Sequence, residues 1–147
     1  MRAVVQRVLE ASVSVEGEAV SAIGAGLLVF LGVEKGDAAE DAAYLAGKIS
    51  RLRMFERPKG KMDLPVVDIG GEALAVSQFT LAADLKKGNR PSFDWAESPE
   101  KAEFLYNLFM ENLRRQGVKV KAGVFGADMK ISLVNDGPVT FVIDSKR

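Results

Sequence analysis

The chain has 147 residues, of which 48% are hydrophobic and 27% are charged, as in an ordinary globular domain that folds without disulfides. It contains no cysteine and no histidine, which excludes disulfides, Cys/His zinc sites, thiol nucleophiles and every catalytic triad with an imidazole base. Twenty lysines and arginines balance twenty aspartates and glutamates, so no overall field attracts nucleic acid and any contact with RNA must be local.

Nothing in the sequence indicates export or a membrane partner. Gln6, Arg7 and Glu10 interrupt the apolar stretch that a signal peptide needs. The longest run of low polarity, residues 22–33, is too short to span a bilayer and contains three glycines. We therefore expect a cytoplasmic protein.

The first part of the chain is predicted to form strands. Residues 2–9 are rich in valine and alternate weakly between apolar and polar positions. Residues 12–23 have the pattern of a hairpin that turns at Glu16-Gly17-Glu18. Residues 26–33 are apolar on both faces, which is typical of a central strand covered on both sides.

A helix is predicted to follow, with Asp37 as its N-cap and its end near residues 54–55. Its apolar stripe consists of Ala42, Leu45, Ile49 and Leu52. Residues 57–62 then have the composition of an exposed basic loop, and residues 68–71 that of a turn.

The next predicted strand, residues 73–81, ends in two hydroxyls and an amide. On an ideal strand Ser77 and Phe79 share one face, whereas Gln78 and Thr80 share the other. The two hydroxyls therefore cannot meet at one site without a bulge, and at most one of them is expected to face a substrate.

A nucleophilic serine or threonine in this strand needs a base, and without histidine only lysine remains. Lys130 can serve if it is desolvated, although nothing in the spacing requires this. A site of backbone N–H and C=O groups, with a substrate that supplies its own activating group, suits this composition better. The Ser–Lys or Thr–Lys pair stays open as an alternative.

Residues 83–93 have the glycine, proline and asparagine content of a loop. Its three cations, Lys86, Lys87 and Arg90, lie close together in the sequence. They make this loop the best local candidate for contact with phosphate.

A second helix is predicted from Ser98, as N-cap before Pro99, to Gly117. Its apolar stripe consists of Phe104, Leu105, Leu108, Phe109 and Leu113. Residues 118–124 alternate like a half-exposed strand.

The C-terminal stretch, residues 129–143, contains two alternating apolar runs joined by Asn135-Asp-Gly-Pro138. This joint predicts a hairpin, and the proline after the glycine makes a cis peptide bond possible. An ordinary tight turn with a trans proline stays open. Together, the elements predict one α/β domain over residues 1–147, with seven or eight strands in layered β-sheets and two main helices packed on one side.

Two motifs in this order resemble the paired signature of a known family. Ser77-Gln-Phe-Thr-Leu81 and Asn135-Asp-Gly-Pro-Val-Thr140 are similar to segments of the D-aminoacyl-tRNA deacylases. Further similar segments are residues 1–7, 51–55, 60–62, 87–93 and 123–129. The resemblance implies the fold of that family and hydrolysis of the ester bond of D-aminoacyl-tRNA, and of mischarged glycyl-tRNA, with no metal or other cofactor.

The resemblance also implies a homodimer in which Gly137-Pro138, joined by a cis bond, reaches into the pocket of the other subunit. Its two carbonyl oxygens would face the chiral centre of the amino acid. Rigid main-chain atoms can reject an L side chain while they hardly touch a D side chain. Arg7 and Asn135 are implied to support this segment.

Ser77, Gln78, Phe79 and Thr80 are implied as residues of the catalytic pocket. In the family pattern the backbone N–H groups of Phe79 and Thr80 lie near the ester carbonyl, and Phe79 lines the adenosine end. The 2′-hydroxyl of the terminal adenosine assists water, and a covalent role of Thr80 is the alternative.

The implied partner is tRNA rather than DNA, with Lys86, Lys87 and Arg90 at the phosphates of the acceptor stem. Asp63 departs from the family pattern, which more often has asparagine there, and it adds a negative charge near this RNA. Two other functions stay open: a non-catalytic module that binds the tRNA acceptor end, and a small-ester hydrolase with a Ser–Lys pair.

Overall fold

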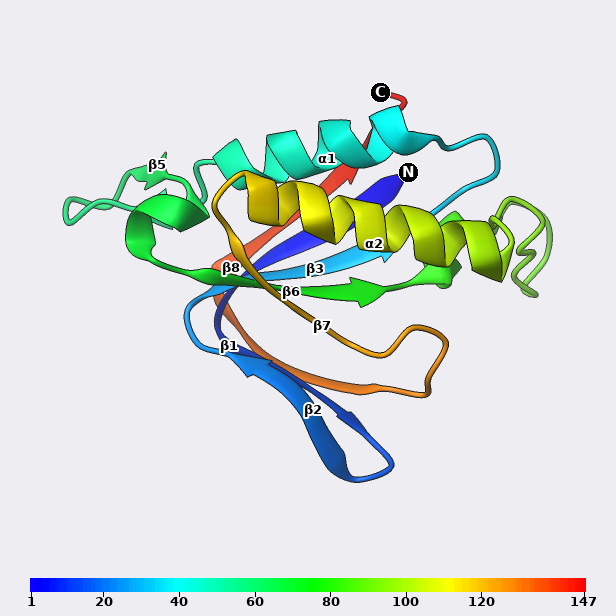
Figure 1. Ribbon diagram of the computed structural model, residues 1–147, viewed down its shortest axis with the longest axis horizontal. Helices are drawn as coiled ribbons and strands as arrows, with labels where there is room; N and C mark the ends of the chain where they lie inside the picture. Colours follow the sequence, from blue (N-terminus) through cyan, green and yellow to red (C-terminus); the bar gives the residue numbers. More distant parts are fainter.

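A six-stranded sheet, a two-stranded sheet and two α-helices form the architecture of the computed structural model, which describes residues 1–147 (Figure 1). The strands are β1 (Arg2–Val15), β2 (Glu18–Ile23), β3 (Gly26–Gly32), β4 (Phe55–Glu56), β5 (Met62–Leu64), β6 (Glu72–Ser77), β7 (Lys119–Ala122) and β8 (Lys130–Asp144). The helices are α1 (Ala39–Arg51) and α2 (Pro99–Arg115), with the short 3-10 helices η1 (Val66–Ile69) and η2 (Phe79–Ala82). The predicted α/β class, with two main helices packed on one side of the sheet, is confirmed.

Strand β1 organises the large sheet because other strands pair along both of its edges. One edge pairs antiparallel with β3 and then with β2, and the other edge pairs antiparallel with β8. β6 and β7 extend the sheet beyond β3 as parallel neighbours. The predicted strand over residues 2–9 and the first arm of the predicted hairpin are one continuous strand, and the chain reverses at Glu16 and Gly17, both with positive φ.

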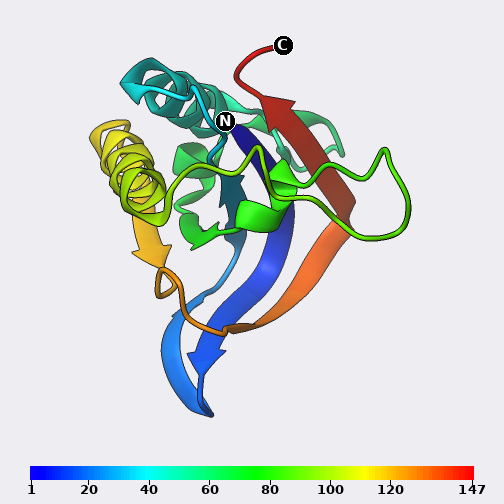
Figure 2. The same ribbon diagram turned by 90° about the vertical axis from the view of Figure 1, so that its right-hand side faces the viewer.

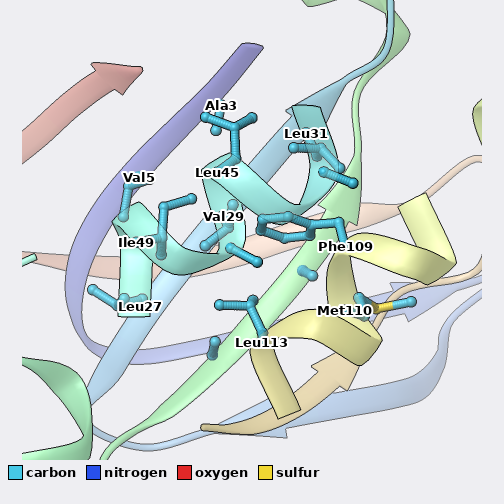
Figure 3. Close-up of a cluster of buried hydrophobic side chains, with 14 of the residues drawn as sticks. Ala3, Val5, Leu27, Val29, Leu31, Leu45, Ile49, Phe109, Met110 and Leu113 are labelled. Carbon is cyan, nitrogen blue, oxygen red and sulfur yellow. The ribbon is translucent and has the colours of Figure 1, made fainter. Parts of the chain in front are cut away.

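Both faces of β3 are buried, as its apolar sequence predicts. On one face, Leu27, Val29 and Leu31 belong to a large core that includes residues of α1 and α2; Figure 3 shows Ile49 and Phe109 packed over this face. The other face of β3 contributes to a smaller cluster, which consists of Val8, Ala11, Val13, Ile23, Leu28, Leu74 and Val76. The sheet curls strongly around this second side (Figure 2), so strands rather than helices cover the smaller cluster.

The first helix begins later and ends earlier than predicted. Its N-cap is Ala38, and its last residue is Arg51. Asp37 is buried and has other partners: its carboxylate accepts hydrogen bonds from the Glu34 amide and the Met1 amine, each at 2.7 Å. The prediction of Asp37 as N-cap is wrong because these two hydrogen bonds, one local and one from the distant N-terminus, engage both carboxylate oxygens.

The second helix has the predicted ends, with Ser98 as N-cap and Gly117 at positive φ just after the last turn. Its buried side chains are Ala102, Leu105, Tyr106, Phe109, Met110 and Leu113. Phe104 was predicted as part of the apolar stripe but is 64% exposed. The buried side chains recur every three or four residues on one face of the helix, and Phe104 does not lie on that face. Neither helix combines the length and the apolarity that a membrane crossing requires.

Candidate active site

The strand predicted over residues 73–81 ends early, at Ser77. After Gln78, the chain turns into η2, so Thr80 lies in a 3-10 helix and not in a strand. Ser77 and Thr80 therefore do not lie on opposite faces of one strand, and that prediction is wrong. A strand continued through Thr80 would need a neighbour beyond β3, but β3 ends at Gly32.

Gly32 makes this turn possible, because the chain packs directly against it. A Cβ atom added to Gly32 would lie 2.8 Å from the Cβ of Leu81 and 3.0 Å from the carbonyl oxygen of Gln78. The Gln78 amide still donates to the carbonyl oxygen of Leu31 at 2.8 Å, so the turn starts from the edge of the sheet. A side chain at residue 32 would displace η2.

A pocket of about 480 Å³ opens where β6 ends. Its lining residues come from four parts of the chain: Val33 after β3; Val76, Ser77, Gln78 and Phe79; Ala96, Glu97, Pro99 and Ala102; and Phe125, Gly126, Ala127, Asp128, Met129 and Ile131. Nine of its fifteen lining residues are hydrophobic, and its volume is in the range of small-ligand sites. The predicted residues Ser77, Gln78 and Phe79 thus share one cavity.

The first N–H groups of η2 have no acceptor within the chain. The amides of Gln78 and Leu81 donate hydrogen bonds, whereas those of Phe79 and Thr80 donate none. The side-chain amide of Gln78 donates to the hydroxyl oxygen of Thr80. The start of η2 therefore has two main-chain donors without an acceptor, beside a hydroxyl that is already hydrogen-bonded; Phe79 lines the pocket, whereas Thr80 is not among its lining residues.

Residues 125–131 form a part of the pocket that the sequence reasoning missed as a site. Gly126 has a positive φ of 77°, and a Cβ atom added to Gly123 would lie 2.6 Å from the sulfur of Met129. The run of small residues between the last two strands was the available signal. It indicates a close approach of the backbone rather than a flexible linker.

The predicted C-terminal hairpin is wrong, because residues 130–144 form one strand, β8, that never reverses. Both of its halves pair antiparallel with the same strand, β1 (Figures 1 and 2). In the register, Gln6 faces Thr140 and Val8 faces Asn135, so residues 136–139 leave the ladder opposite Arg7. We call residues 136–139 the excursion. Its peptide bond between Gly137 and Pro138 is cis.

Arg7 and Asn135 hold the excursion from two sides. Arg7 is only 5% exposed; its Nε donates to the carbonyl oxygen of Asp136 at 3.0 Å, and its Nη1 donates to that of Met54 at 2.8 Å. Asn135 accepts a hydrogen bond from the Val139 amide at 2.8 Å and donates to the Thr140 hydroxyl at 3.0 Å. Arg7 is thus a buried group that binds two carbonyls.

The two sequence motifs do not meet within one chain. Gly137 lines a separate cavity of about 390 Å³ with Arg7, Phe55, Glu56, Ile69 and Asp136, and no residue of the Ser77 segment lines it. Gly137 and Pro138 are themselves exposed. The excursion therefore presents its tip outward, away from the pocket at Ser77.

The basic loop is closed at its base. Asp84 and Ser92 exchange backbone hydrogen bonds of 2.8 and 3.1 Å, and Lys86, Lys87 and Arg90 lie between them and are exposed. Figure 2 shows the loop between η2 and α2 projecting from the body of the protein. The three predicted cations are thus presented together at one tip.

Two other charged residues named from the sequence have local partners. Lys130 is 75% exposed at its side chain and pairs with Asp128 at 3.0 Å, so it is not the desolvated lysine that a Ser–Lys or Thr–Lys pair requires. Asp63 lies between Arg57 and Arg53, the latter at 3.2 Å. The hydrogen bond from Arg57 is the main reason that the pKa of Asp63 is held below its ordinary value. Two arginines thus offset the negative charge at residue 63.

Comparison with known proteins agrees with the resemblance of the motifs. The family described as D-Tyr-tRNA(Tyr) deacylase matches residues 4–144. The D-aminoacyl-tRNA deacylase of Geobacter sulfurreducens is 56% identical over 146 residues, which cover 99% of this chain and 96% of that protein. That of Koribacter versatilis is 56% identical over 147 residues, which cover 100% of this chain and 99% of that protein.

Solved structures share the fold over the same length. A protein named c-Myc DNA Unwinding Element Binding Protein has a TM-score of 0.91 at 46% identity, with 98% of each chain covered. A probable eukaryotic D-amino acid tRNA deacylase has a TM-score of 0.81 at 18% identity, with 97% of each chain covered, and shows the fold alone. From the family match and these identities, the chain belongs to the D-Tyr-tRNA(Tyr) deacylase family.

Proposed function

We propose that this protein is a cytoplasmic homodimeric hydrolase that cleaves the ester bond of D-aminoacyl-tRNA, and of mischarged glycyl-tRNA, to free amino acid and tRNA. Membership of the family over residues 4–144 supports the reaction class. The observation that carries the proposal is the end of β6, where two main-chain N–H groups without an acceptor begin η2 beside a pocket of about 480 Å³.

In the proposed reaction, water attacks the ester carbonyl and the bond to the 3′-oxygen of the terminal ribose breaks. The N–H groups of Phe79 and Thr80 stabilise the negative charge that develops on the carbonyl oxygen. The 2′-hydroxyl of the same ribose assists the water, because the chain has no histidine or cysteine and Lys130 is solvated. The ring of Phe79, 56% exposed, contacts the adenosine.

The excursion is proposed to select chirality in the pocket of the other subunit, through the carbonyl oxygens of Gly137 and Pro138. The exposure of Gly137 and Pro138, and their place outside the pocket at Ser77, support action between subunits. The hydrogen bonds from Arg7 and Asn135 support a rigid segment, which steric rejection of an L side chain requires.

The proposed dimer is supported by the free edge of β8. This 15-residue strand pairs only with β1, and it exposes the apolar side chains of Val134, Phe141 and Val142. A long apolar edge strand is normally paired or covered. A second copy is the partner that the proposed site needs.

Lys86, Lys87 and Arg90 are proposed to contact phosphates of the acceptor stem. They carry charge without any ion pair inside the chain, and the closed base of the loop holds them together. Such contacts would make tRNA affinity fall with salt but would not read sequence.

The function is tested by incubating the purified protein with matched D-tyrosyl-tRNA and L-tyrosyl-tRNA. We expect hydrolysis of the D form alone. Equal turnover of both forms would refute the chirality proposal, and no turnover of either would refute the enzyme. A D-tyrosyl-tRNA that ends in 2′-deoxyadenosine should react far more slowly; full activity on it would favour Thr80 as nucleophile.

Action between subunits is tested by mixing two inactive variants. One carries Gly137→Val in the excursion, and the other carries Ala127→Trp, which fills the pocket. If the excursion serves the neighbouring pocket, each mixed dimer contains one intact site, and activity returns on subunit exchange. If the mixture stays inactive while both variants form dimers, the excursion does not act in the other subunit.

A further inference from the structure

Trp95 is the only tryptophan of the chain, and it is 60% exposed. An indole ring of this size in water is unusual, because burial of its apolar surface is favourable. Tryptophan left exposed on a defined backbone is a common feature of surfaces that bind a partner.

The backbone around Trp95 is fixed to the end of β3. The carbonyl oxygen of Trp95 accepts a hydrogen bond from the Lys35 amide at 2.8 Å, and the Glu97 amide donates to the carbonyl oxygen of Val33 at 3.1 Å. The Ala96 amide donates to the carbonyl oxygen of Phe93 at 3.0 Å. Trp95 is therefore exposed on an ordered bridge, not on a free loop tip.

This bridge lies at the rim of the pocket. The two residues that follow Trp95, Ala96 and Glu97, both line the cavity. Phe93 stands edge-on to Phe79, with ring centroids 5.1 Å apart, and Phe79 lines the same cavity. Phe79 and Phe93 thus form an aromatic pair at the pocket, and the exposed Trp95 follows Phe93 by two residues.

The free charges near this rim are three cations on the basic loop and one carboxylate, Asp94. Lys86, Lys87 and Arg90 have no ion pair in the chain, whereas Glu97 pairs with Lys101 at 3.2 Å. Glu34 pairs with Arg2 at 3.3 Å. Asp94 is exposed and unpaired, so the positive charge is confined to Lys86, Lys87 and Arg90 at the tip of the basic loop and does not extend to the surface around Trp95.

We propose that Trp95 stacks on an unpaired base of the tRNA 3′ end, one that precedes the terminal adenosine. The inference rests on the proposed function, which places that adenosine at Phe79. The single strand between adenosine and acceptor stem must leave the pocket over its rim. Aromatic rings beside cations are how proteins hold single-stranded RNA without reading its sequence. The substrate is then recognised by its single strand as well as by its amino acid.

The experiment uses the fluorescence of Trp95, which no other tryptophan obscures. The probes are two RNA hairpins with the same acceptor stem, one with a single-stranded 3′ extension and one blunt. We expect the extended hairpin to quench Trp95 on binding, because a base stacks on the indole. The blunt hairpin should bind more weakly, through phosphates, without quenching. Trp95→Ala should weaken binding of the extended hairpin about tenfold, and Trp95→Phe by less.

Phe104→Ala is the matched control, since Phe104 is 64% exposed on α2 and outside the pocket. It should leave RNA binding unchanged. Equal quenching by the blunt hairpin would overturn the inference. The inference would also be overturned if, in the protein without RNA, iodide quenched Trp95 fluorescence less as the protein concentration rose. A second copy of the chain would then cover the indole.

Failure of the inference and failure of the proposed function give different results. A preparation that hydrolyses D-tyrosyl-tRNA but shows no quenching by the extended hairpin removes the role of Trp95 and leaves the enzyme intact. A preparation that shows the expected quenching but hydrolyses no aminoacyl-tRNA supports the stacking role and removes the reaction.

Discussion

The end of β6 and the excursion of β8 are both places where the sheet is interrupted, but the two interruptions differ in kind. At Ser77 the strand stops, the chain turns into η2, whose first two N–H groups have no acceptor, and a cavity opens beside it. At Asn135 the strand continues, and four residues protrude before pairing resumes at Thr140. One region is concave and offers donors, and the other is convex and exposes main chain.

Within one chain the two regions line separate cavities. The proposed dimer would bring the tip of one copy to the concave wall of the other. Within one chain Arg2 connects their surroundings, since it donates to the carbonyl oxygen of Leu81 in η2 at 2.8 Å and to Asp144 of β8 at 3.3 Å. Four predictions test this comparison.

Gly137→Ala should have the largest effect. The added Cβ would lie 2.7 Å from Cγ2 of Val139 and 3.0 Å from Nη2 of Arg7, at a φ of +135°. The tip must move, and we expect D-tyrosyl-tRNA hydrolysis to fall about 100-fold in single-turnover assays. Gly117→Ala is the control, because Gly117 also has positive φ but no atom within 4 Å of the added Cβ. Wild-type rates for Gly137→Ala would contradict the close packing of Gly137 against Val139 and Arg7.

Arg7→Ala should destabilise the protein by about 2 kcal/mol in urea unfolding, because the carbonyls of Met54 and Asp136 lose their donor in a mostly buried place. The stability of Arg7→Lys should lie between those of the wild type and Arg7→Ala, since one ammonium group cannot reach both oxygens as the guanidinium does. Arg53→Ala removes an arginine whose side chain is 71% exposed and should change stability by less than about 0.5 kcal/mol. Equal losses for Arg7 and Arg53 would mean that Arg7 does not hold the excursion.

Asp144 anchors the far end of β8, and its contribution should depend on pH. Burial opposes its ionisation, but hydrogen bonds from the Lys146 amide and from Arg2 outweigh burial and hold its pKa below the ordinary 3.8. Its stabilising effect is therefore fully present above 3.8 and is lost as pH falls through the lower folded pKa. Asp144→Asn should lower the free energy of unfolding by about 1 kcal/mol at pH 7 and leave it unchanged at a pH below the folded pKa of Asp144. A loss that does not change with pH would contradict this role.

Thr80→Ala should have the smallest effect. If main-chain donors and the substrate's own hydroxyl carry the reaction, loss of the Thr80 hydroxyl, already bonded to Gln78, should slow hydrolysis only about threefold. Lys130→Ala should be equally mild. A covalent nucleophile would instead show a loss of about a million-fold, measured at saturating tRNA.

Much of the fold follows from local patterns. Gly26–Gly32 is apolar on both faces and is buried on both, and Ser98, Pro99 and Gly117 mark the ends of α2. The predictions failed where a distant contact competes with a local preference. Asp37 is a good N-cap in isolation, yet the Glu34 amide and the Met1 amine bind its carboxylate instead.

The candidate site shows the same limit. The motifs at Ser77–Thr80 and Asn135–Thr140 were named from the sequence as parts of the site. Residues 123–129 were named only as a segment similar to the family, and Trp95 was not named. Ser77 ends its strand because Gly32 lets η2 pack against β3, and that neighbour is 45 positions away in the chain. No pattern within either segment contains this information.

The sequence by itself determined the absence of imidazole and thiol chemistry, the α/β class and the identity of the two motifs, because composition and periodicity are local properties. Only the tertiary structure decided that Asn135-Asp-Gly-Pro138 protrudes from a continuous strand instead of reversing it. The physical reason is the length of β1: its 14 residues offer a pairing edge to both halves of β8, and main-chain hydrogen bonds along that edge hold the two halves in line.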